Sequence, residues 1–340
     1  MNIGILTLPL YNNYGGILQA YALKTILEQM GHHPYLLKRY SDTTAWAFYL
    51  KKILGAIGVS RYSGKRYTSI TKFVKREFLT SPNLLSHSDF IRATTTLNLN
   101  AIIVGSDQVW RKDFCIGSGM DYFLNLDSSN IKRISYAASF GVDTWDFSMD
   151  ETNIIKKCLS LFSGISLREK TYIPTLFQHT GYKAQPCLDP TLLLNADHYK
   201  QFINKRPIAE DYTFVYWLGS KDELHKHLPK DTKTIQIRLN DPKCCSIEEW
   251  LTYLYYANDI ITDSFHGCVF SLLFHKKLMI FKNRNGGISR LISLFSMFEI
   301  EELLNNPTYQ IDYNKFEQLL AIHREHSISF IKKSLEAEVN

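Results

Sequence analysis

The sequence lacks the features that mark fibrous, disordered and membrane-spanning proteins. Only 17 glycines and 10 prolines occur in 340 residues, with no short repeat, which excludes collagen-like and low-complexity chains. The longest apolar stretches, such as residues 268–274, are far shorter than the roughly 20 residues that cross a bilayer. The chain opens at Met1 without a basic leader. We therefore expect a folded protein that is neither integral to a membrane nor exported by a simple signal.

Cysteine is also sparse, and its spacing carries no framework. The six cysteines are scattered, with no C-x-x-C pair, so neither a zinc knuckle nor a disulfide scaffold is indicated. The adjacent pair Cys244 and Cys245 is assigned no role. Histidines and aspartates also lack the spacing of metal ligands. We predict no metal and no cofactor, and a location in the reducing cytoplasm.

Positive charge is concentrated in one segment. The net charge is +6, but residues 43–80 contain eight lysines and arginines against Glu77 alone. Trp46, Tyr49 and Leu50 lie among these cations. The combination is typical of a segment on an anionic membrane face or a polyanionic ligand, and an amphipathic helix with one core face is the alternative. No recognised nucleic-acid motif accompanies it, so we expect no nucleic-acid partner.

Apolar strands and helical patterns alternate along the chain, which predicts an α/β protein with mainly parallel sheets covered on both faces. The expected strands lie at residues 2–8, 101–105, 133–137, 164–167, 212–218, 234–237, 259–262 and 278–281. Prolines near the middle interrupt the pattern. We predict an N-terminal domain over residues 1–190 and a C-terminal domain over residues 191–310. A helix within residues 311–340 is expected to return across the junction.

Ligands of such sheets bind beyond the carboxyl ends of the strands, so the loops after strands are the candidate sites. The first loop, residues 11–16, suits sugar hydroxyls but lacks a dinucleotide or Walker motif. Helix capping by Asn12 or Asn13 is its alternative. The second, residues 104–110, presents a hydroxyl, a carboxylate, an amide and the indole of Trp110, a set that suits a saccharide. Its carboxylate, Asp107, is alternatively a helix cap.

Two further loops carry charge. Arg168 ends a strand before a helix, a position that suits a carboxylate or phosphate ligand, with a plain ion pair to Glu169 or another carboxylate as the alternative. His266 falls in the first turn of a helix directly after the strand at residues 259–262. An imidazole there can exchange a proton near physiological pH, although a structural histidine is the alternative. Several cations and one histidine indicate a small anionic substrate.

Together these motifs resemble the polysaccharide pyruvyltransferase family. The matching segments, in the order of the family, are residues 2–6, 13–23, 103–110, 133–141, 166–170, 188–191 and 262–267. The resemblance implies two Rossmann-like domains facing across a cleft, similar to the GT-B glycosyltransferase fold. It also implies transfer of pyruvate from phosphoenolpyruvate to a sugar diol of a surface polysaccharide precursor. The products are a pyruvate ketal and phosphate.

The resemblance also implies roles for individual residues. His266 matches the catalytic histidine of the family and Arg168 a donor-binding arginine, while Asp107 is a candidate base. Many relatives have Arg-Leu-His where this chain has Ser-Phe-His, so another cation has to replace the missing arginine. The donor-binding candidates are Arg168, Ser264, Phe265, Lys282, Arg290 and, less directly, Arg284. The acceptor-binding candidates are Asn13, Tyr14, Gly15, Gly16, Ser106 and Gln108.

Two other functions share this architecture. One is a glycosyltransferase that uses a sugar nucleotide, and the other is a non-catalytic protein that binds a saccharide or an anion. For the pyruvyltransferase, a lipid-linked acceptor at the inner face of the cytoplasmic membrane would give the basic segment at residues 43–80 a purpose.

Overall fold

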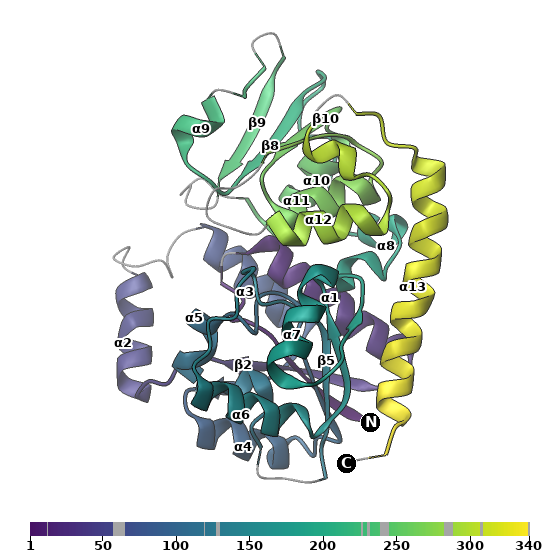
Figure 1. The fold of residues 1–340 in the computed structure, drawn as a ribbon. Helices are drawn as coiled ribbons and strands as arrows, with labels where there is room; N and C mark the ends of the chain where they lie inside the picture. Colours follow the sequence, from purple (N-terminus) through teal and green to yellow (C-terminus); the bar gives the residue numbers. More distant parts are fainter. Residues whose placement is uncertain are drawn as a thin grey trace.

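The computed structural model describes residues 1–11, 13–56, 65–118, 120–126, 130–225, 227–229, 232–238, 245–281, 288–306 and 309–338. Two parallel sheets organise these residues, one in each half of the molecule (Figure 1). Both sheets are covered by helices. The expectation of an α/β protein with parallel sheets is confirmed.

Within the described ranges, the first sheet has seven parallel strands in the order β3-β2-β1-β4-β5-β6-β7. They are β1 (Asn2–Leu6), β2 (His33–Arg39), β3 (Leu79–Leu84), β4 (Ala101–Val104), β5 (Lys132–Ala138), β6 (Phe162–Leu167) and β7 (Gln185–Pro186). The order reverses between β1 and β4, because their connections lead to opposite edges of the sheet. A reversal of this kind is where ligands of open α/β sheets bind.

The helices of the first half follow its strands. They are α1 (Tyr14–Gln29), α2 (Ala45–Ala56), α3 (Lys65–Glu77), α4 (His87–Thr96), α5 (Lys112–Cys115), α6 (Met149–Leu159) and α7 (Ile173–Thr180). Short 3-10 turns lie at η1 (Ile116–Ser118), η2 (Asp121–Phe123), η3 (Lys170–Tyr172) and η4 (Pro190–Leu192). Helix α1 is buried over most of its length, since it packs on its own sheet and on the second half.

The second sheet has the order β11-β10-β8-β9 in the part of the chain that the structure describes. Its strands are β8 (Thr213–Trp217), β9 (Thr234–Arg238), β10 (Asp259–Thr262) and β11 (Lys277–Ile280). The helices of this half are α8 (Ala196–Lys200), α9 (Lys221–His225), α10 (Ile247–Tyr256), α11 (Phe265–Leu273) and α12 (Ile288–Met297), with the turn η5 (Glu301–Leu304). Helix α11 is buried along its whole length, so β10 leads directly into the core of this half.

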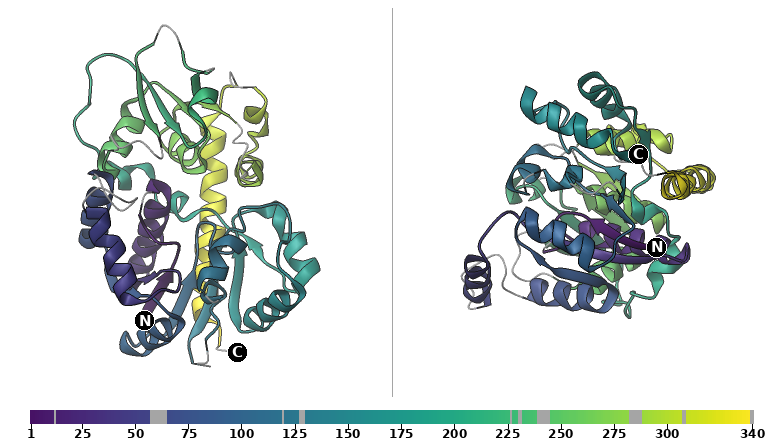
Figure 2. Two further views of the ribbon diagram at one scale, coloured as in Figure 1. Left: turned by 90° about the vertical axis from the view of Figure 1, so that its left-hand side faces the viewer. Right: turned by 90° about the horizontal axis from the view of Figure 1, so that it is seen from below.

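The two halves share one apolar core. The ring of Tyr14 on α1 stacks on Trp250 of α10, with centroids 5.5 Å apart. The long helix α13 (Tyr313–Glu336) runs beside both halves (Figures 1 and 2). At its far end, Lys132 of β5 donates to the carbonyl of Leu335. Helix α13 therefore braces the first half after the chain has completed the second.

The basic segment at residues 43–80 divides into two different helices. Helix α3 buries Ile70 and Phe73, and its Arg76 pairs with Glu248 of the second half. Helix α2 lies at the edge of the first half, apart from the other helices (Figures 1 and 2), and packs the buried ring of Phe48 on Tyr40 at 4.8 Å. No helix among the described residues combines the length and apolarity of a membrane span. For α3 the alternative of an amphipathic helix with one core face is the right one.

Candidate active site

Arg168 and Asp189 form a buried ion pair at the carboxyl edge of the first sheet. Arg168 directly follows β6 and Asp189 lies shortly after its neighbour β7, so parallel pairing brings both to one edge. Nη1 of Arg168 donates to Oδ2 of Asp189 over 2.9 Å, and both side chains are enclosed. The guanidinium carbon lies 4.5 Å from the centre of the Phe265 ring. Arg168 is thus fixed by a carboxylate and an aromatic face. The alternative of a plain ion pair with a carboxylate therefore holds as far as the pairing goes, with Asp189 and not Glu169 as the partner.

Burial and neighbouring charges shift the pKa values of this pair in opposite directions. Burial disfavours the charged guanidinium, but Asp189, Glu169 and Asp107 raise the pKa of Arg168 overall. Burial also disfavours the Asp189 carboxylate, yet the charges of His266 and Arg168 bring its pKa well below the usual range. Both members of the pair are therefore charged at neutral pH.

His266 reaches this pair from the second half. It lies in the first turn of α11, where the N-cap Ser264 accepts a hydrogen bond from the Gly267 N–H over 3.3 Å. Its Nε2 lies 3.5 Å from Oδ2 of Asp189. On the other side, a Cβ built on Gly15 of α1 would lie 2.0 Å from Nδ1 of the imidazole. The imidazole fits between α1 and Asp189 because position 15 has no side chain.

Asp107 approaches the same point from the loop after β4. Its φ of +73° is in the left-handed region, which aspartate tolerates better than most residues. Asn13 donates from Nδ2 to Oδ2 of Asp107 over 3.2 Å, and Oδ1 lies 3.6 Å from Nη2 of Arg168. A Cβ on Gly16 would come within 3.3 Å of Oδ2. The carboxylate therefore lies against the N-terminus of α1, where the helix dipole favours negative charge.

Glu169 and Arg290 add one charge of each sign. Ser139 donates a short hydrogen bond to Oε1 of Glu169, and burial raises the pKa of this carboxyl in spite of the nearby Arg168. Arg290 lies in the first turn of α12. Burial, reinforced by the positive charge of Arg168, lowers the pKa of Arg290, and Glu169 opposes that shift. Two guanidinium groups from opposite halves thus lie within each other's electrostatic influence.

Several buried polar atoms in this cluster make no hydrogen bond within the described part of the chain. They are Nε and Nη2 of Arg168, Oε2 of Glu169, Nε2 of His266, Oγ of Ser289 and Nε of Arg290. One other such atom, on Trp250, lies elsewhere. Buried polar groups are nearly always satisfied, so this concentration of unsatisfied polar atoms makes the cluster the candidate site for a polar ligand. Most of the atoms are nitrogens, which fits an anionic one.

Two residues predicted to bind the acceptor make structural contacts within the chain. Tyr14 is buried, and its hydroxyl donates to the carbonyl of Cys245 over 2.8 Å. Ser106 is buried too, and its hydroxyl donates to the carbonyl of Ala137 and faces Asp189 at 3.3 Å. The bond of Tyr14 joins the halves and the bonds of Ser106 position Asp189. Their contacts with an acceptor stay predictions.

Other expectations about the two polar loops also need correction. Gly15 and Gly16 belong to the first turn of α1 rather than to a loop. Asn13 is the N-cap of α1, but its side chain makes no cap hydrogen bond. Asp107 caps no helix. Trp110 is fully buried, stacks on Phe123 at 5.1 Å and offers no platform to a sugar.

The remaining candidate residues are still predictions. Ser264 and Phe265 directly precede His266: Ser264 is the N-cap of α11, and the ring of Phe265 lies against the guanidinium of Arg168. The Gln108 side chain is half-buried and accepts a long hydrogen bond from Arg111. Three candidates lie outside the described residues: Asn12, Lys282 and Arg284. Arg290 is the described cation that the structure brings to Arg168.

The sequence reasoning missed Asp189 and Glu169 as site residues. Both lie inside segments that it singled out, and a buried acidic residue next to a predicted anion site is a usable signal because buried charges need partners. No group of three or more His, Cys, Asp or Glu side chains in the described ranges is placed to hold a metal ion.

The arrangement of two parallel sheets is that of the GT-B class. The structure assigned to a UDP-N-acetylglucosamine 2-epimerase from Listeria monocytogenes superposes with a TM-score of 0.50 at 10% identity, covering 99% of this chain and 91% of that one. The UDP-GlcNAc 2-epimerase from Methanocaldococcus jannaschii gives a TM-score of 0.48 at 11% identity, with coverage of 100% and 94%. At these identities the likeness concerns the fold alone.

The sequence profile of the family described as polysaccharide pyruvyl transferase matches residues 13–285. The matched range includes Asp107, Arg168 and His266. Because it spans most of the chain, the protein belongs to the polysaccharide pyruvyl transferase family. No curated protein matches the chain.

Proposed function

We propose that the protein transfers pyruvate from phosphoenolpyruvate to two hydroxyls of a sugar, forming a ketal and releasing phosphate. The observation that carries this proposal is the convergence of Arg168, Arg290 and His266, whose unsatisfied nitrogens belong to one buried cluster. Phosphoenolpyruvate has a carboxylate, a phosphate and an enol carbon that must gain a proton. Two guanidinium groups and an imidazole suit these three requirements.

Arg168 is oriented to hold one oxyanion of the donor. Asp189 occupies its Nη1. Its Nε and Nη2 make no hydrogen bond in the described chain, and Nη2 has the Asp107 carboxylate 3.6 Å away as an ion-pair partner. The edge formed by Nε and Nη2 donates two parallel N–H groups, the geometry that a carboxylate or a phosphate accepts. Arg290 of α12 lies within electrostatic reach of Arg168 and is proposed to supply a second cation, in the role for which the sequence offered several candidates.

His266 is proposed to protonate the methylene carbon of phosphoenolpyruvate. The carbon that bears the phosphate becomes cationic, and one sugar hydroxyl adds to it and loses its proton. The bond from that carbon to the phosphate oxygen then breaks, and the second hydroxyl adds and loses its proton. One hydroxyl proton is balanced by the new methyl group and the other by the released hydrogen phosphate. The arginines stabilise the departing phosphate, an effect often worth several kcal/mol in a dry site.

The carboxylates have separate proposed tasks. Asp107 lies 3.6 Å from Arg168 and is held by Asn13, so it is the candidate that receives a hydroxyl proton. Asp189 positions both Arg168 and His266 through one oxygen atom. Asp189 does not need to touch substrate for this task.

Substrate entry requires the halves to separate at His266. Its ring contacts Gly15 on one face and approaches Asp189 at Nε2, both in the first half. We therefore propose that phosphoenolpyruvate enters an opened arrangement and that closure brings Arg168, Arg290 and His266 around it.

The test is release of inorganic phosphate from phosphoenolpyruvate in the presence of a panel of sugars and glycosyl phosphates. Release that depends on the sugar, with a ketal product detected by mass spectrometry, is the expected result. Transfer of a sugar from a nucleotide sugar to the same acceptors, without phosphate release, would favour a glycosyltransferase instead. Binding of phosphoenolpyruvate with no turnover on any acceptor would favour a non-catalytic binding protein.

Helix α2 is proposed to hold the protein on an anionic membrane face, where a lipid-linked acceptor would be met. Trp46, Tyr49 and Leu50 are exposed on this helix, and Trp46 is 71% exposed. Sedimentation with vesicles of anionic lipid is the test, with Trp46→Ser and Tyr49→Ser combined as the variant. Phe177→Ser, at an exposed ring on α7, is the control. Equal sedimentation of the wild type and the double variant would refute this contact.

A further inference from the structure

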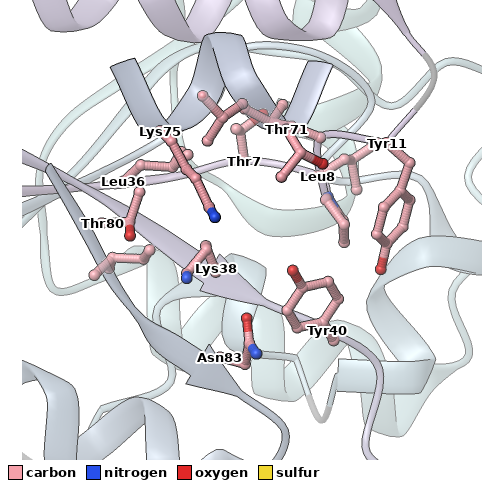
Figure 3. Close-up of a pocket in the computed structure, with 14 residues that line it drawn as sticks. Thr7, Leu8, Tyr11, Leu36, Lys38, Tyr40, Thr71, Lys75, Thr80 and Asn83 are labelled. Carbon is pink, nitrogen blue, oxygen red and sulfur yellow. The ribbon is translucent and has the colours of Figure 1, made fainter. Parts of the chain in front are cut away.

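A pocket lies beside the candidate active site and is lined by the first half alone. It has a volume of about 190 Å³ and opens at the carboxyl ends of β1, β2 and β3, beneath α3 (Figure 3). The lining residues are Thr7, Leu8, Pro9, Leu10, Tyr11, Leu36, Leu37, Lys38, Tyr40, Thr71, Val74, Lys75, Thr80 and Asn83. None of the proposed donor-binding residues is among them.

The lining has a definite charge. It contains two ammonium groups, on Lys38 and Lys75, and no carboxylate among the residues that the structure describes. Figure 3 shows the two lysines on one side of the hollow and the rings of Tyr11 and Tyr40 on the other. These rings stack with their centroids 5.8 Å apart. The amide of Asn83 lies at the edge nearest Tyr40 in the same view.

The sheet holds this lining in place. Lys38, near the end of β2, and Tyr40, just after it, both line the pocket. Arg39 points to the opposite face, where its Nε donates to Asp121 over 2.5 Å and both side chains are fully buried. Burial of this pair fixes the end of β2. The pocket is therefore preformed on the side of β2.

The pocket and the active-site cluster share one loop. Thr7, at the end of β1, lines the pocket and donates from its hydroxyl to the carbonyl of Ser106, the residue before Asp107. The loop that begins at Thr7 continues through Tyr11 to Asn13, whose side chain holds Asp107. The loop that lines the pocket therefore also carries the residue that holds the proposed base, Asp107.

We infer that this pocket binds an anionic group, a phosphate or a carboxylate, carried by the acceptor saccharide. Lysine ammonium groups supply the charge, the stacked tyrosines support a sugar ring, and the amide and threonine hydroxyls suit its hydroxyl groups. The acceptor role rests on the proposed function. Binding of an anionic sugar in the pocket does not, because none of the lining residues belongs to the donor cluster.

The test is calorimetric titration of the full chain with glucose 1-phosphate, glucuronic acid and glucose. The variants are Lys38→Gln and Lys75→Gln, and the control is Lys72→Gln, an exposed lysine on the same helix α3 that does not line the pocket. We expect one or both charged sugars to bind more tightly than glucose. Each lining variant should weaken that binding about tenfold, as expected for loss of one charged hydrogen bond, and the control should leave it unchanged. Thermal unfolding shows that the variants are folded.

Phosphoenolpyruvate is titrated into the same proteins to separate the two proposals. Its affinity should stay within about twofold in the lining variants, since Arg168 is untouched.

Tight binding of glucose 1-phosphate alone identifies a glycosyl phosphate as the source of the anion, and tight binding of glucuronic acid alone identifies an acidic sugar. The inference is overturned if the charged sugars bind the wild type no better than glucose does. It is also overturned if they bind both lining variants as tightly as they bind the wild type. Loss of phosphoenolpyruvate binding in Lys75→Gln would show that the pocket serves the donor, and would overturn it too. If phosphoenolpyruvate fails to bind while lysine-dependent sugar binding persists, the pocket stands and the proposed function fails.

Discussion

Gly15 and His266, from opposite halves of the molecule, meet so closely that a Cβ on the glycine would lie 2.0 Å from Nδ1 of the imidazole. The N-terminus of α1 and the N-terminus of α11 thus meet at the residue proposed to transfer the proton. The imidazole is therefore also part of the packing between the halves. A change that forces the ring away from Gly15 disturbs this packing.

Gly15→Ala should therefore impair both stability and turnover. The added methyl group cannot fit without moving His266 or α1, which we expect to cost about 1–3 kcal/mol in the free energy of unfolding and to reduce phosphate release at least tenfold. Gly31→Ala is the control, because that glycine has a φ of +81° and open space around it. It should lose about 1 kcal/mol of stability and keep its turnover. Chemical denaturation and a phosphate assay measure the two effects; full turnover in Gly15→Ala would contradict the contact's role.

His266→Asn should abolish proton transfer while leaving the donor bound. General acid catalysis contributes roughly 10²–10⁴-fold, so we expect kcat to fall by at least about 100-fold and the affinity for phosphoenolpyruvate to change by less than about threefold. His275→Asn, at an exposed position after α11, is the matched control. A variant at position 266 with the kcat of the wild type removes the histidine from the mechanism.

Arg168→Lys should weaken donor binding although it keeps the positive charge of the site. Lysine keeps the positive charge but loses the fork of parallel N–H groups, so the affinity for phosphoenolpyruvate is expected to drop at least tenfold. Arg111→Lys, a partly exposed arginine that pairs with Asp113, should bind the donor normally. Calorimetric titration decides, and an unchanged affinity in Arg168→Lys would mean that the donor is held elsewhere.

The Asp189 carboxylate should make stability depend on pH in acid. Burial opposes its charge, but His266 and Arg168 outweigh burial and depress the folded pKa below the unfolded value of about 3.9. Its contribution is therefore complete above about pH 5 and is lost as the pH falls below about 4. The difference in unfolding free energy between the wild type and Asp189→Asn should therefore shrink as the pH falls below about 4. A gap that stays constant between pH 3 and pH 7, or one of equal size in the exposed control Asp197→Asn, argues against this pairing.

Much of the fold follows from the sequence because its central strands are apolar on both faces. The strands β1, β4, β8 and β10 are almost continuous apolar runs that end in polar loops, and each of their predicted positions is confirmed. β2, β3 and β7 were not predicted. β2 and β3 mix buried residues with partly or fully exposed ones in no regular alternation and contain prolines, while β7 has two residues. Their pairing depends on neighbouring strands rather than on local pattern.

The candidate site was predictable at its charged positions and not in its geometry. Arg168, Asp107 and His266 were named because polar residues directly follow apolar strands, and the structure brings all three together. The tasks of Tyr14 and Ser106 depend on contacts between distant parts of the chain, to Cys245 and Ala137, which no local pattern contains. Residues whose partners are far away in sequence are assigned correctly only once the packing is known.

The most direct test of the proposed function is thermal unfolding with phosphoenolpyruvate and, separately, with a panel of nucleotide sugars. A ligand at 100 times its Kd stabilises the native state by about 2.7 kcal/mol, enough for a clear shift in the midpoint. The proposal predicts that phosphoenolpyruvate raises the Tm of the wild type and has a much smaller effect on Arg168→Lys, while nucleotide sugars have none. A rise with a nucleotide sugar and no rise with phosphoenolpyruvate would contradict it.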